Sequence, residues 1–318
     1  MAEEAATVSA AHPRLTDLIA SARVAPPAVT AIVYPVDATV VEAALITARL
    51  GIIEPVFYGP ASHQALLTAA GASSLQFRWV DTGNSAREAA RIAVADSAAG
   101  RVALLMKGSL HTDELLGAVL LRDSGLCGSG RLTHAFVFDL PRYHKLIALT
   151  DAVVNISPNL QSKAESLNHA IDLMREVGVT APKIAVLAAV ETVHSRIPAT
   201  VDARALAVWG ASGRFGNATV DGPFGFDNAI SSKAAATKGI VSVVAGDPDI
   251  LLAPDLNAGN ILYKSFVYIG GGECAGVVQG ARVPIVLTSR ADSLFSRVAS
   301  CALARLSLRR GEQNAPIC

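Results

Sequence analysis

The stretch A-P-D-L-N-A-G-N-I-L-Y-K, residues 253–264, carries the strongest local signal in the chain. It follows an apolar run that predicts the end of a buried strand, and its polar residues open a predicted helix. Unpaired backbone N–H groups at such a helix start form a natural anion site. Asn257, Asn260 and Lys264 are spaced three and four apart and share one helix face. The stretch indicates either one wall of a ligand cleft or an ordinary turn with Asp255 or Asn257 as N-cap.

Upstream of this stretch, apolar runs alternate with amphipathic segments. The expected strands are residues 31–35, 55–58, 77–80 and 102–106, and the expected helices are residues 14–21, 39–50, 62–70 and 84–99. Continuous apolar strands separated by helices of about 10–15 residues are typical of a parallel sheet covered on both faces. The first part of the chain is therefore predicted to be α/β.

A change of rhythm follows, because the expected strands 134–140 and 146–156 have no helix between them. Two such strands predict an antiparallel pair and mark a second domain. The remaining expected helices are 160–177, 202–209, 228–238 and 291–309, and the remaining strands are 184–190, 219–220, 241–244, 250–252, 276–278 and 284–288. We predict a first α/β domain from residues 1–131 plus 284–318, and a second from residues 132–283.

Composition narrows the class of protein. The 318 residues include 27 Lys plus Arg and 27 Asp plus Glu, so the net charge is zero and no basic excess supports a nucleic-acid or anionic-membrane partner. No apolar run approaches the roughly 20 residues of a spanning helix, and the N-terminus has no apolar signal-peptide region. The four cysteines lack metal-ligand spacing and predict reduced thiols in a cytoplasmic protein without a metal site.

Residues Lys107, Ser109, His111 and Thr112 follow the expected strand 102–106, at the carboxyl end where α/β sheets bind ligands. The ammonium, the two hydroxyls and the first N–H groups of the next helix are suited to hold a phosphate. The alternative is that Thr112 merely caps this helix. His111 and the two carboxylates after it are not matched by a second ligand cluster, so no metal is expected.

Asp221 follows the short expected strand 219–220 beside a Gly-Pro pair, and is either a turn former or a cleft acid. The glycine-rich segments 210–216 and 270–272 both follow expected helices, so neither matches a dinucleotide-binding loop.

Ser289, Arg290 and Asp292 stand between the expected strand 284–288 and the last helix. Arginine grips phosphate bidentately, and a hydroxyl and a carboxylate beside it can divide hydrogen bonding and proton transfer. The alternative is a plain N-cap with a solvated arginine.

Three of these segments together resemble the phosphate acetyl/butyryl transferase family. They are D-G-P-F-G-F-D-N-A (residues 221–229), A-G-D-P-D-I-L-L-A-P-D-L-N-A-G-N-I-L-Y-K-S (245–265) and P-I-V-L-T-S-R-A-D-S (284–293). Residues 106–116 and 188–194 resemble the butyryl-type branch, and also the transferase part of enzymes that fuse an enoyl-CoA hydratase to it. The similarity begins near residue 14, and we expect no hydratase segment before it.

The resemblance implies two α/β domains with mostly parallel sheets facing across a cleft, usually in a homodimer. It implies a reversible reaction in which acyl-CoA and phosphate give acyl phosphate and CoA, with CoA as substrate and no tightly bound cofactor. Arg290 would hold the phosphate, and Ser289 would hydrogen-bond the thiol or the oxyanion. Acetyl-type enzymes carry an Asp base seven residues after this serine, where the present chain has Ser296, so Asp292 is expected to substitute.

The expectation is a cytoplasmic phosphate acyltransferase that acts on acetyl-, propionyl- or butyryl-CoA. Its other substrate contacts are expected from Lys107, Ser109, His111, Thr112, Asp221, Asp255, Asn257, Asn260 and Lys264. On the opening stretch, Asn260 and Lys264 are the residues most expected to face the ligand, and Asp255 and Asn257 either contact it or only shape the turn. The alternatives are a non-catalytic sensor of CoA or acyl phosphate, and a fold-related hydroxyacid dehydrogenase that uses a metal and NAD.

Overall fold

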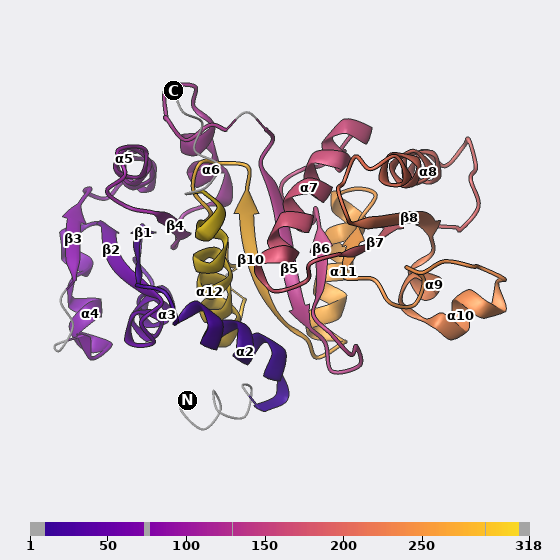
Figure 1. Cartoon of the computed structure of the whole chain (residues 1–318). Helices are drawn as coiled ribbons and strands as arrows, with labels where there is room; N and C mark the ends of the chain where they lie inside the picture. Colours follow the sequence, from indigo (N-terminus) through magenta and orange to yellow (C-terminus); the bar gives the residue numbers. More distant parts are fainter. Residues whose placement is uncertain (1–9, 73–76, 129, 290, 312–318) are drawn as a thin grey trace. The chain divides into compact units, whose positions relative to one another are not determined.

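Parallel strands with continuous apolar sequences form the centre of the first of two units into which the chain divides (Figure 1). The computed structural model describes residues 10–72, 77–128, 130–289 and 291–311. Unit 1 comprises residues 1–132 and 273–318, and unit 2 comprises residues 133–272. The expected α/β class with mostly parallel sheets is confirmed.

The strands of unit 1 follow the order β3-β2-β1-β4-β11-β10. They are β1 (Ala28–Val33), β2 (Ile53–Gly59), β3 (Arg78–Asp81), β4 (Leu104–Lys107), β10 (Glu273–Gln279) and β11 (Ile285–Val286). All pair in parallel except β10, which runs antiparallel to β11. Every residue of β4 is buried, as a strand covered on both faces requires.

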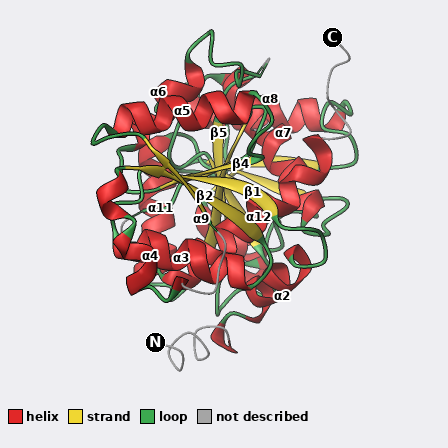
Figure 2. Cartoon of the chain, turned by 90° about the vertical axis from the view of Figure 1, so that its left-hand side faces the viewer, coloured by secondary structure: helices red, strands yellow, loops and turns green. Residues whose placement is uncertain are grey.

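Helices cover both faces of these strands. They are α2 (Pro13–Ala22), α3 (Ala38–Arg49), η1 (Ala61–His63), α4 (Ala65–Ala69), α5 (Ala86–Ala98), α6 (Thr112–Leu120) and α12 (Leu294–Gly311). Figure 2 shows α5 and α6 on one side of β1, β2 and β4, with α3 and α4 on the other. Helix α12 packs on β10, where the hydroxyls of Ser296 and Ser300 accept hydrogen bonds from the backbone N–H groups of Cys274 and Gly276.

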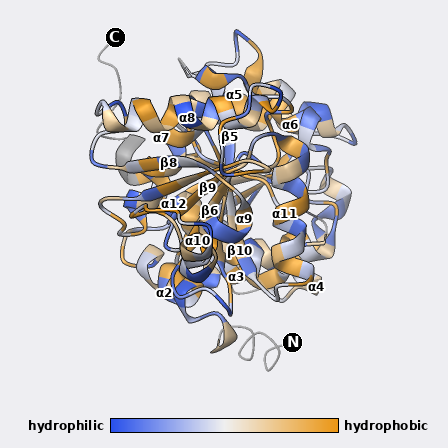
Figure 3. Ribbon diagram, turned by 90° about the vertical axis from the view of Figure 1, so that its right-hand side faces the viewer, coloured by the Kyte–Doolittle hydropathy of each residue, from blue (hydrophilic) through white to orange (hydrophobic). Residues whose placement is uncertain are grey.

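Unit 2 has the strand order β5-β6-β9-β7-β8. Its elements are β5 (Thr133–Asp139), β6 (Ile147–Thr150), α7 (Leu160–Glu176), β7 (Lys183–Leu187), α8 (Pro198–Ala211), β8 (Thr219–Phe224), α9 (Phe226–Ile230), α10 (Ser232–Thr237), β9 (Ile250–Leu252) and α11 (Leu256–Tyr268). Strands β5 and β6 form the expected antiparallel pair, and the other pairs are parallel. Figure 3 shows α7 and α8 on one side of the strands, with α9 and α10 on the other.

The division between the units differs from the sequence expectation at one end. Residues 273–283, which were expected in the second domain, group with unit 1. The physical reason is that β10 pairs with β11 and packs under α12.

Several element boundaries were predicted wrongly. The expected strand 241–244 is absent: this described segment has no strand, and Val241 is 99% exposed. The expected helix 228–238 is two helices, because Ser231 ends α9 and caps α10 through a hydrogen bond from the N–H of Ala234. Strand β8 continues to Phe224, so Asp221 lies inside a strand rather than after one. The last helix begins at Leu294 instead of at residue 291.

Among the described residues, no helix is long and apolar enough to cross a membrane.

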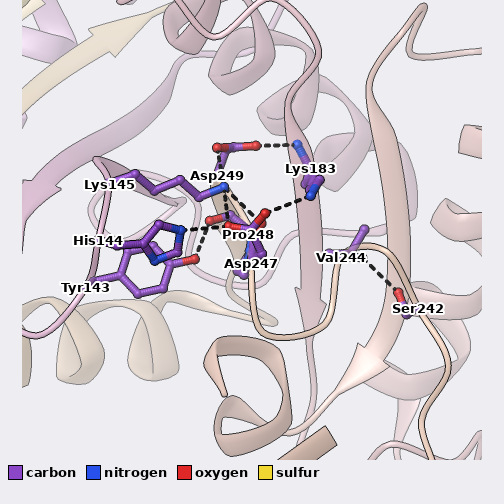
Figure 4. Close-up of polar contacts among 9 residues, drawn as sticks. All are labelled: Tyr143, His144, Lys145, Lys183, Ser242, Val244, Asp247, Pro248 and Asp249. Carbon is purple, nitrogen blue, oxygen red and sulfur yellow. Dashed lines mark hydrogen bonds and ion pairs between the residues drawn. The ribbon is translucent and has the colours of Figure 1, made fainter. Parts of the chain in front are cut away.

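A network of charged side chains joins the turn between β5 and β6 to the segment before β9 (Figure 4). The carboxylate of Asp247 contacts His144 Nε2 at 2.9 Å, Lys145 Nζ at 2.8 Å and Lys183 Nζ at 2.7 Å. Lys145 also contacts Asp249 at 2.8 Å. Burial opposes ionisation of Asp247, but the hydrogen bonds from Lys145 and Lys183 outweigh it and hold its pKa well below the usual range.

The substitution Asp247→Asn is expected to lower the free energy of unfolding by about 1 kcal/mol at pH 7, since these ion pairs are partly exposed. The folded-state pKa of Asp247 is depressed, so its contribution is present above the unfolded-state pKa near 4 and is lost as pH falls through the folded value. Urea unfolding at pH 7 and at successively lower pH measures the difference. The control is Asp17→Asn, which changes an exposed carboxylate of unit 1. An unfolding difference between wild type and Asp247→Asn that grows on acidification would contradict this account.

Candidate functional site

A small cavity lies in unit 1 at the carboxyl ends of its central parallel strands. Its volume is about 30 Å³, and it is lined by Asp37, Thr39, Val40, Lys107, Gly108, Ser109, Thr288 and Arg297. The charged side chains are two cations, Lys107 and Arg297, and one carboxylate, Asp37. The excess positive charge and the position at the carboxyl ends of the strands favour an anionic ligand.

Lys107 is the last residue of β4, and only 7% of its surface is exposed. Its ammonium donates hydrogen bonds of 3.2 Å to the carbonyl oxygens of Gly108 and Leu110. A buried ammonium is stable only when such acceptors or a counter-ion surround it. Ser109, the second binding residue expected from this segment, lines the same cavity.

The turn after β4 is pinned against the end of β1. The N–H groups of Gly108 and Ser109 donate to the carbonyls of Val33 and Tyr34, at 2.8 and 2.9 Å. A Cβ at residue 108 would lie 2.3 Å from the Val33 oxygen, so only glycine fits there. Tyr34 adopts a φ of 55°, an uncommon conformation for a non-glycine residue and one that clusters at functional sites.

Arg297 enters the cavity from α12 and is almost fully buried. Its Nη2 donates to the carbonyl of Ser289 at 3.0 Å and its Nε to that of Asp292 at 3.4 Å. The sequence interpretation missed this residue. The sequence offered one signal for it: an arginine eight residues after Ser289, in a segment of the last expected helix whose other residues are apolar or small.

The Ser289 segment borders the same cavity. Ser289 is exposed, and its backbone N–H donates to Asp292 Oδ2 at 2.6 Å. Thr288 is buried, and its Oγ1 has no hydrogen-bond partner in the part of the chain that the structure describes. A buried hydroxyl without a partner costs about 1–3 kcal/mol, which a polar ligand in the cavity would recover. Arg290 lies outside the described residues.

Asp37 completes the lining as the N-cap of α3. Its Oδ1 accepts hydrogen bonds from the N–H and the hydroxyl of Thr39, at 2.8 and 2.7 Å. These hydrogen bonds, with a smaller contribution from the charge of Arg297, lower the pKa of Asp37. The carboxylate is therefore ionised at neutral pH and offsets part of the positive charge of the cavity.

His111 and Thr112 are not among the residues that line the cavity. His111, rather than Thr112, is the N-cap residue of α6, and its backbone N–H donates to Glu114 Oε2 at 2.9 Å. The alternative that Thr112 is the cap of this helix was therefore wrong.

In unit 2, the stretch 253–264 forms the start of α11 after β9. Asp255 is its N-cap, accepting a hydrogen bond of 3.0 Å from the N–H of Ala258. A Cβ at residue 259 would lie 2.6 Å from the Asp151 carbonyl oxygen, so glycine lets the helix approach the turn after β6. Asn260 Nδ2 donates to the carbonyl of Ala152 at 3.1 Å. Asp255 and Asn260 thus both shape local structure.

Asn257 and Lys264 are exposed on the same helix. Asp221 is half-buried in β8, and its Oδ1 accepts the N–H of Gly222 at 2.8 Å. Apart from His111 and Thr112, which lie in unit 1 but do not line the cavity, the described residues of the expected site fall into two groups. Lys107, Ser109, Ser289 and Asp292 belong to unit 1, with Arg297, and Asp221, Asp255, Asn257, Asn260 and Lys264 belong to unit 2.

A buried histidine was also missed. His134 in β5 is fully buried, and neither ring nitrogen has a hydrogen-bond partner among the residues described. Burial lowers its pKa to about 4, against the opposing charge of Asp151. The ring is therefore neutral at physiological pH. Asp151 accepts hydrogen bonds from the backbone N–H of His134, at 3.2 Å, and from Asn155 Nδ2, at 2.6 Å.

A cationic cavity at the strand ends of a parallel α/β unit is typical of proteins that bind anionic ligands. Comparison with known proteins identifies the family. The family described as "Phosphate acetyl/butaryl transferase" matches residues 72–305. The chain belongs to this family.

Two relatives and one solved structure illustrate the similarity. The chain is 43% identical over 302 residues to "Phosphate acetyltransferase" of Rhizobium meliloti, covering 94% of this chain and 96% of the relative. It is 40% identical over 293 residues to "Probable phosphate butyryltransferase" of Bacillus subtilis, covering 92% and 97%. The branched-chain phosphotransacylase from Enterococcus faecalis V583 has a TM-score of 0.75 at 28% identity, covering 88% of this chain and 99% of that one.

Proposed function

We propose that the chain is an acyltransferase that moves a short-chain acyl group reversibly between CoA and inorganic phosphate. The cavity that contains Lys107, Arg297 and the hydroxyl of Thr288 carries this proposal, because its charge and donors suit a phosphate group. The family and relatives such as the phosphate acetyltransferase of Rhizobium meliloti support the reaction type.

In this proposal, Lys107 and Arg297 bind the phosphate that enters or leaves as acyl phosphate. Arg290, beside Ser289 in the sequence, grips the same group, and the Ser289 hydroxyl hydrogen-bonds the thiol or the developing oxyanion. Attack of the thiolate on acyl phosphate requires no covalent enzyme intermediate. Holding the two reactants together and stabilising the tetrahedral oxyanion is sufficient.

The residues of unit 2 are proposed to contact CoA. Asn257 and Lys264 are exposed on α11 and available for this role, whereas Asn260 and Asp255 keep the helix start in place. His111, Thr112 and Asp221 remain predicted substrate contacts. A homodimer and a cytoplasmic location are part of the proposal; the free thiols of Cys127, Cys274 and Cys301 are consistent with a reducing compartment.

The test is a series of acyl-CoA substrates. Purified protein is incubated with acetyl-, propionyl- or butyryl-CoA with and without phosphate, and free thiol is followed with a chromogenic disulfide. We expect phosphate-dependent CoA release from at least one substrate. We expect kcat/KM to differ gradually among the three acyl-CoA substrates, because one methylene group changes discrimination between substrates by only about 1–3 kcal/mol. If no acyl-CoA releases CoA in a phosphate-dependent way, the chain is not this enzyme, and a binding sensor becomes the better interpretation.

A further inference from the structure

Glu273 is the first residue of β10, at the edge of unit 1 where Ser289 follows β11. In the antiparallel β10–β11 pair, Val278 lies opposite Ile285. Because the strands are antiparallel, the position four residues before Val278 lies opposite the position four residues after Ile285. This register places Cys274 level with Ser289. Glu273 therefore stands at the same end of the sheet as the Ser289 segment.

Two serine hydroxyls at the start of α12 hold the Glu273 carboxylate. Ser293 Oγ donates to Glu273 Oε2 at 2.6 Å, and Ser296 Oγ donates to the same oxygen at 2.5 Å. The hydroxyls are themselves fixed, because Ser293 Oγ accepts the N–H of Ser296 and Ser296 Oγ accepts the N–H of Cys274. Glu273 is half-buried, and the two side-chain hydrogen bonds that it accepts from described residues both go to Oε2. These hydroxyls therefore anchor Oε2, and neither of them occupies Oε1.

The other carboxylates near this edge serve the backbone. Asp292 Oδ2 accepts the N–H of Ser289 and keeps the segment before α12 in shape. Asp37 Oδ1 accepts two hydrogen bonds from Thr39 as the cap of α3. The thiol of CoA has to lose a proton when it attacks acyl phosphate, so the proposed reaction needs an acceptor at this edge. Glu273 differs from Asp292 and Asp37, because among the described residues its carboxylate caps no backbone N–H and is held only by two side-chain hydroxyls, through Oε2.

We propose that Glu273 is the general base of this chain, an inference that rests on the proposed acyltransferase function. The thiol sulfur forms a bond to the acyl carbon, and the bond between that carbon and the phosphate oxygen breaks with its electron pair going to phosphate. The thiol proton passes to Oε1 of Glu273, which later releases it to water. In the reverse direction, protonated Glu273 gives the proton to the departing thiolate. Ser293 and Ser296 are positioning residues that orient the carboxylate.

Among the described residues, the titratable and charged groups on the elements packed around Glu273 include Asp292, Cys274 and Arg297. They also include His12, the residue before α2, because its ring centroid lies 6.4 Å from that of Phe295 on α12. Asp292 and Glu273 both act on the Cys274 thiol, whose pKa is raised chiefly by burial. Arg297 lies on α12 one residue after Ser296 and binds the carbonyls of Ser289 and Asp292. The remaining neighbours, Ser293 and Ser296, do not titrate in the range of the assay.

The test compares Glu273→Gln with wild type in the direction from acetyl phosphate and CoA to acetyl-CoA, between pH 6.5 and 9. Glutamine keeps the size and can still accept the serine hydrogen bonds, but it is not basic. A thiol with a pKa near 8.5 is about 3% ionised at pH 7, so the loss is expected to be about 30-fold there. At pH 9 most of the thiol is already ionised, and the two rates are expected to agree within about twofold.

Asp292→Asn is the matched control, since asparagine still accepts the Ser289 N–H; its rate relative to wild type is expected to be independent of pH. Glu273→Asp retains a carboxylate on a side chain one methylene shorter; its rate is expected to fall less than that of Glu273→Gln at pH 7 and to approach the wild-type rate at pH 9. Urea unfolding shows whether Glu273→Gln folds; if it does not, Glu273→Asp tests the role of Glu273 in its place. A ratio to the wild-type rate that is constant across pH, for Glu273→Gln or, where that variant does not fold, for Glu273→Asp, overturns the role of Glu273. Wild-type protein without any transfer activity would overturn the proposed function, and with it this role.

Discussion

Replacing Lys107 by methionine is expected to lower kcat/KM for phosphate by about 100-fold, mainly through a higher KM. Methionine has a similar length but no charge, and a hydrogen bond to a charged group is worth about 1.5–3 kcal/mol. Each 1.36 kcal/mol corresponds to a factor of ten. The effect is large because Lys107 is buried at the end of β4, where water cannot replace it.

The measurement is the initial rate of CoA release at varied phosphate. Lys233→Met serves as the control, because Lys233 is an exposed lysine of α10 in unit 2. Urea unfolding of both variants shows whether the Gly108 and Leu110 carbonyls, which lose their ammonium donor, destabilise unit 1. If Lys107→Met keeps the wild-type KM for phosphate, the cavity is not the phosphate site.

Replacing Arg297 by leucine is expected to lower kcat/KM by about 1,000-fold, the largest effect in this account. The substitution removes a cation of the cavity and also both hydrogen bonds that hold the Ser289 and Asp292 carbonyls. A charged hydrogen bond contributes about 1.5–3 kcal/mol, and misplacement of Ser289 and Arg290 adds to the loss. Both kcat and KM for phosphate are therefore expected to change.

Arg297→Lys is the informative companion variant. Lysine keeps the charge but lacks the planar fork that spans two carbonyls, so we expect partial recovery of KM and little recovery of kcat. Steady-state kinetics at varied phosphate separate the two effects. Activity of Arg297→Leu within threefold of wild type would show that Arg297 neither binds phosphate nor places the Ser289 segment.

Much of the fold could be predicted because its signals are local. The buried apolar runs of β1 and β4 identify these segments as strands, and glycines such as the one after α3 mark where helices end. Failures occurred where tertiary context decides the structure. Val241 and Val243 form part of an apolar run by sequence, but they find no sheet neighbour and stay exposed. The position of residues 273–283 depends on the pairing of β10, which periodicity does not encode.

The candidate site was predictable only for residues next to strand ends. Lys107, Ser109 and Ser289 follow strands directly, and sheet topology brings the ends of β4 and β11 together. Arg297 had only a weak sequence signal, and Glu273 had none, because the contacts that hold both side chains depend on the packing of α12 on β10. Asn260 has a polar side chain on the expected helix face, but its amide is engaged by the Ala152 carbonyl, a contact invisible in the sequence.

Product stoichiometry shows most directly whether the chain passes an acyl group between CoA and phosphate. Acyl-CoA and phosphate are incubated with the protein, the acyl phosphate is trapped with hydroxylamine as the hydroxamate, and free CoA is measured in the same samples. Because hydroxylamine also attacks thioesters slowly, both products are measured above a sample without protein; we expect hydroxamate and CoA to form in equal amounts, only with phosphate present. CoA release without acyl phosphate would indicate thioester hydrolysis and contradict the proposed function.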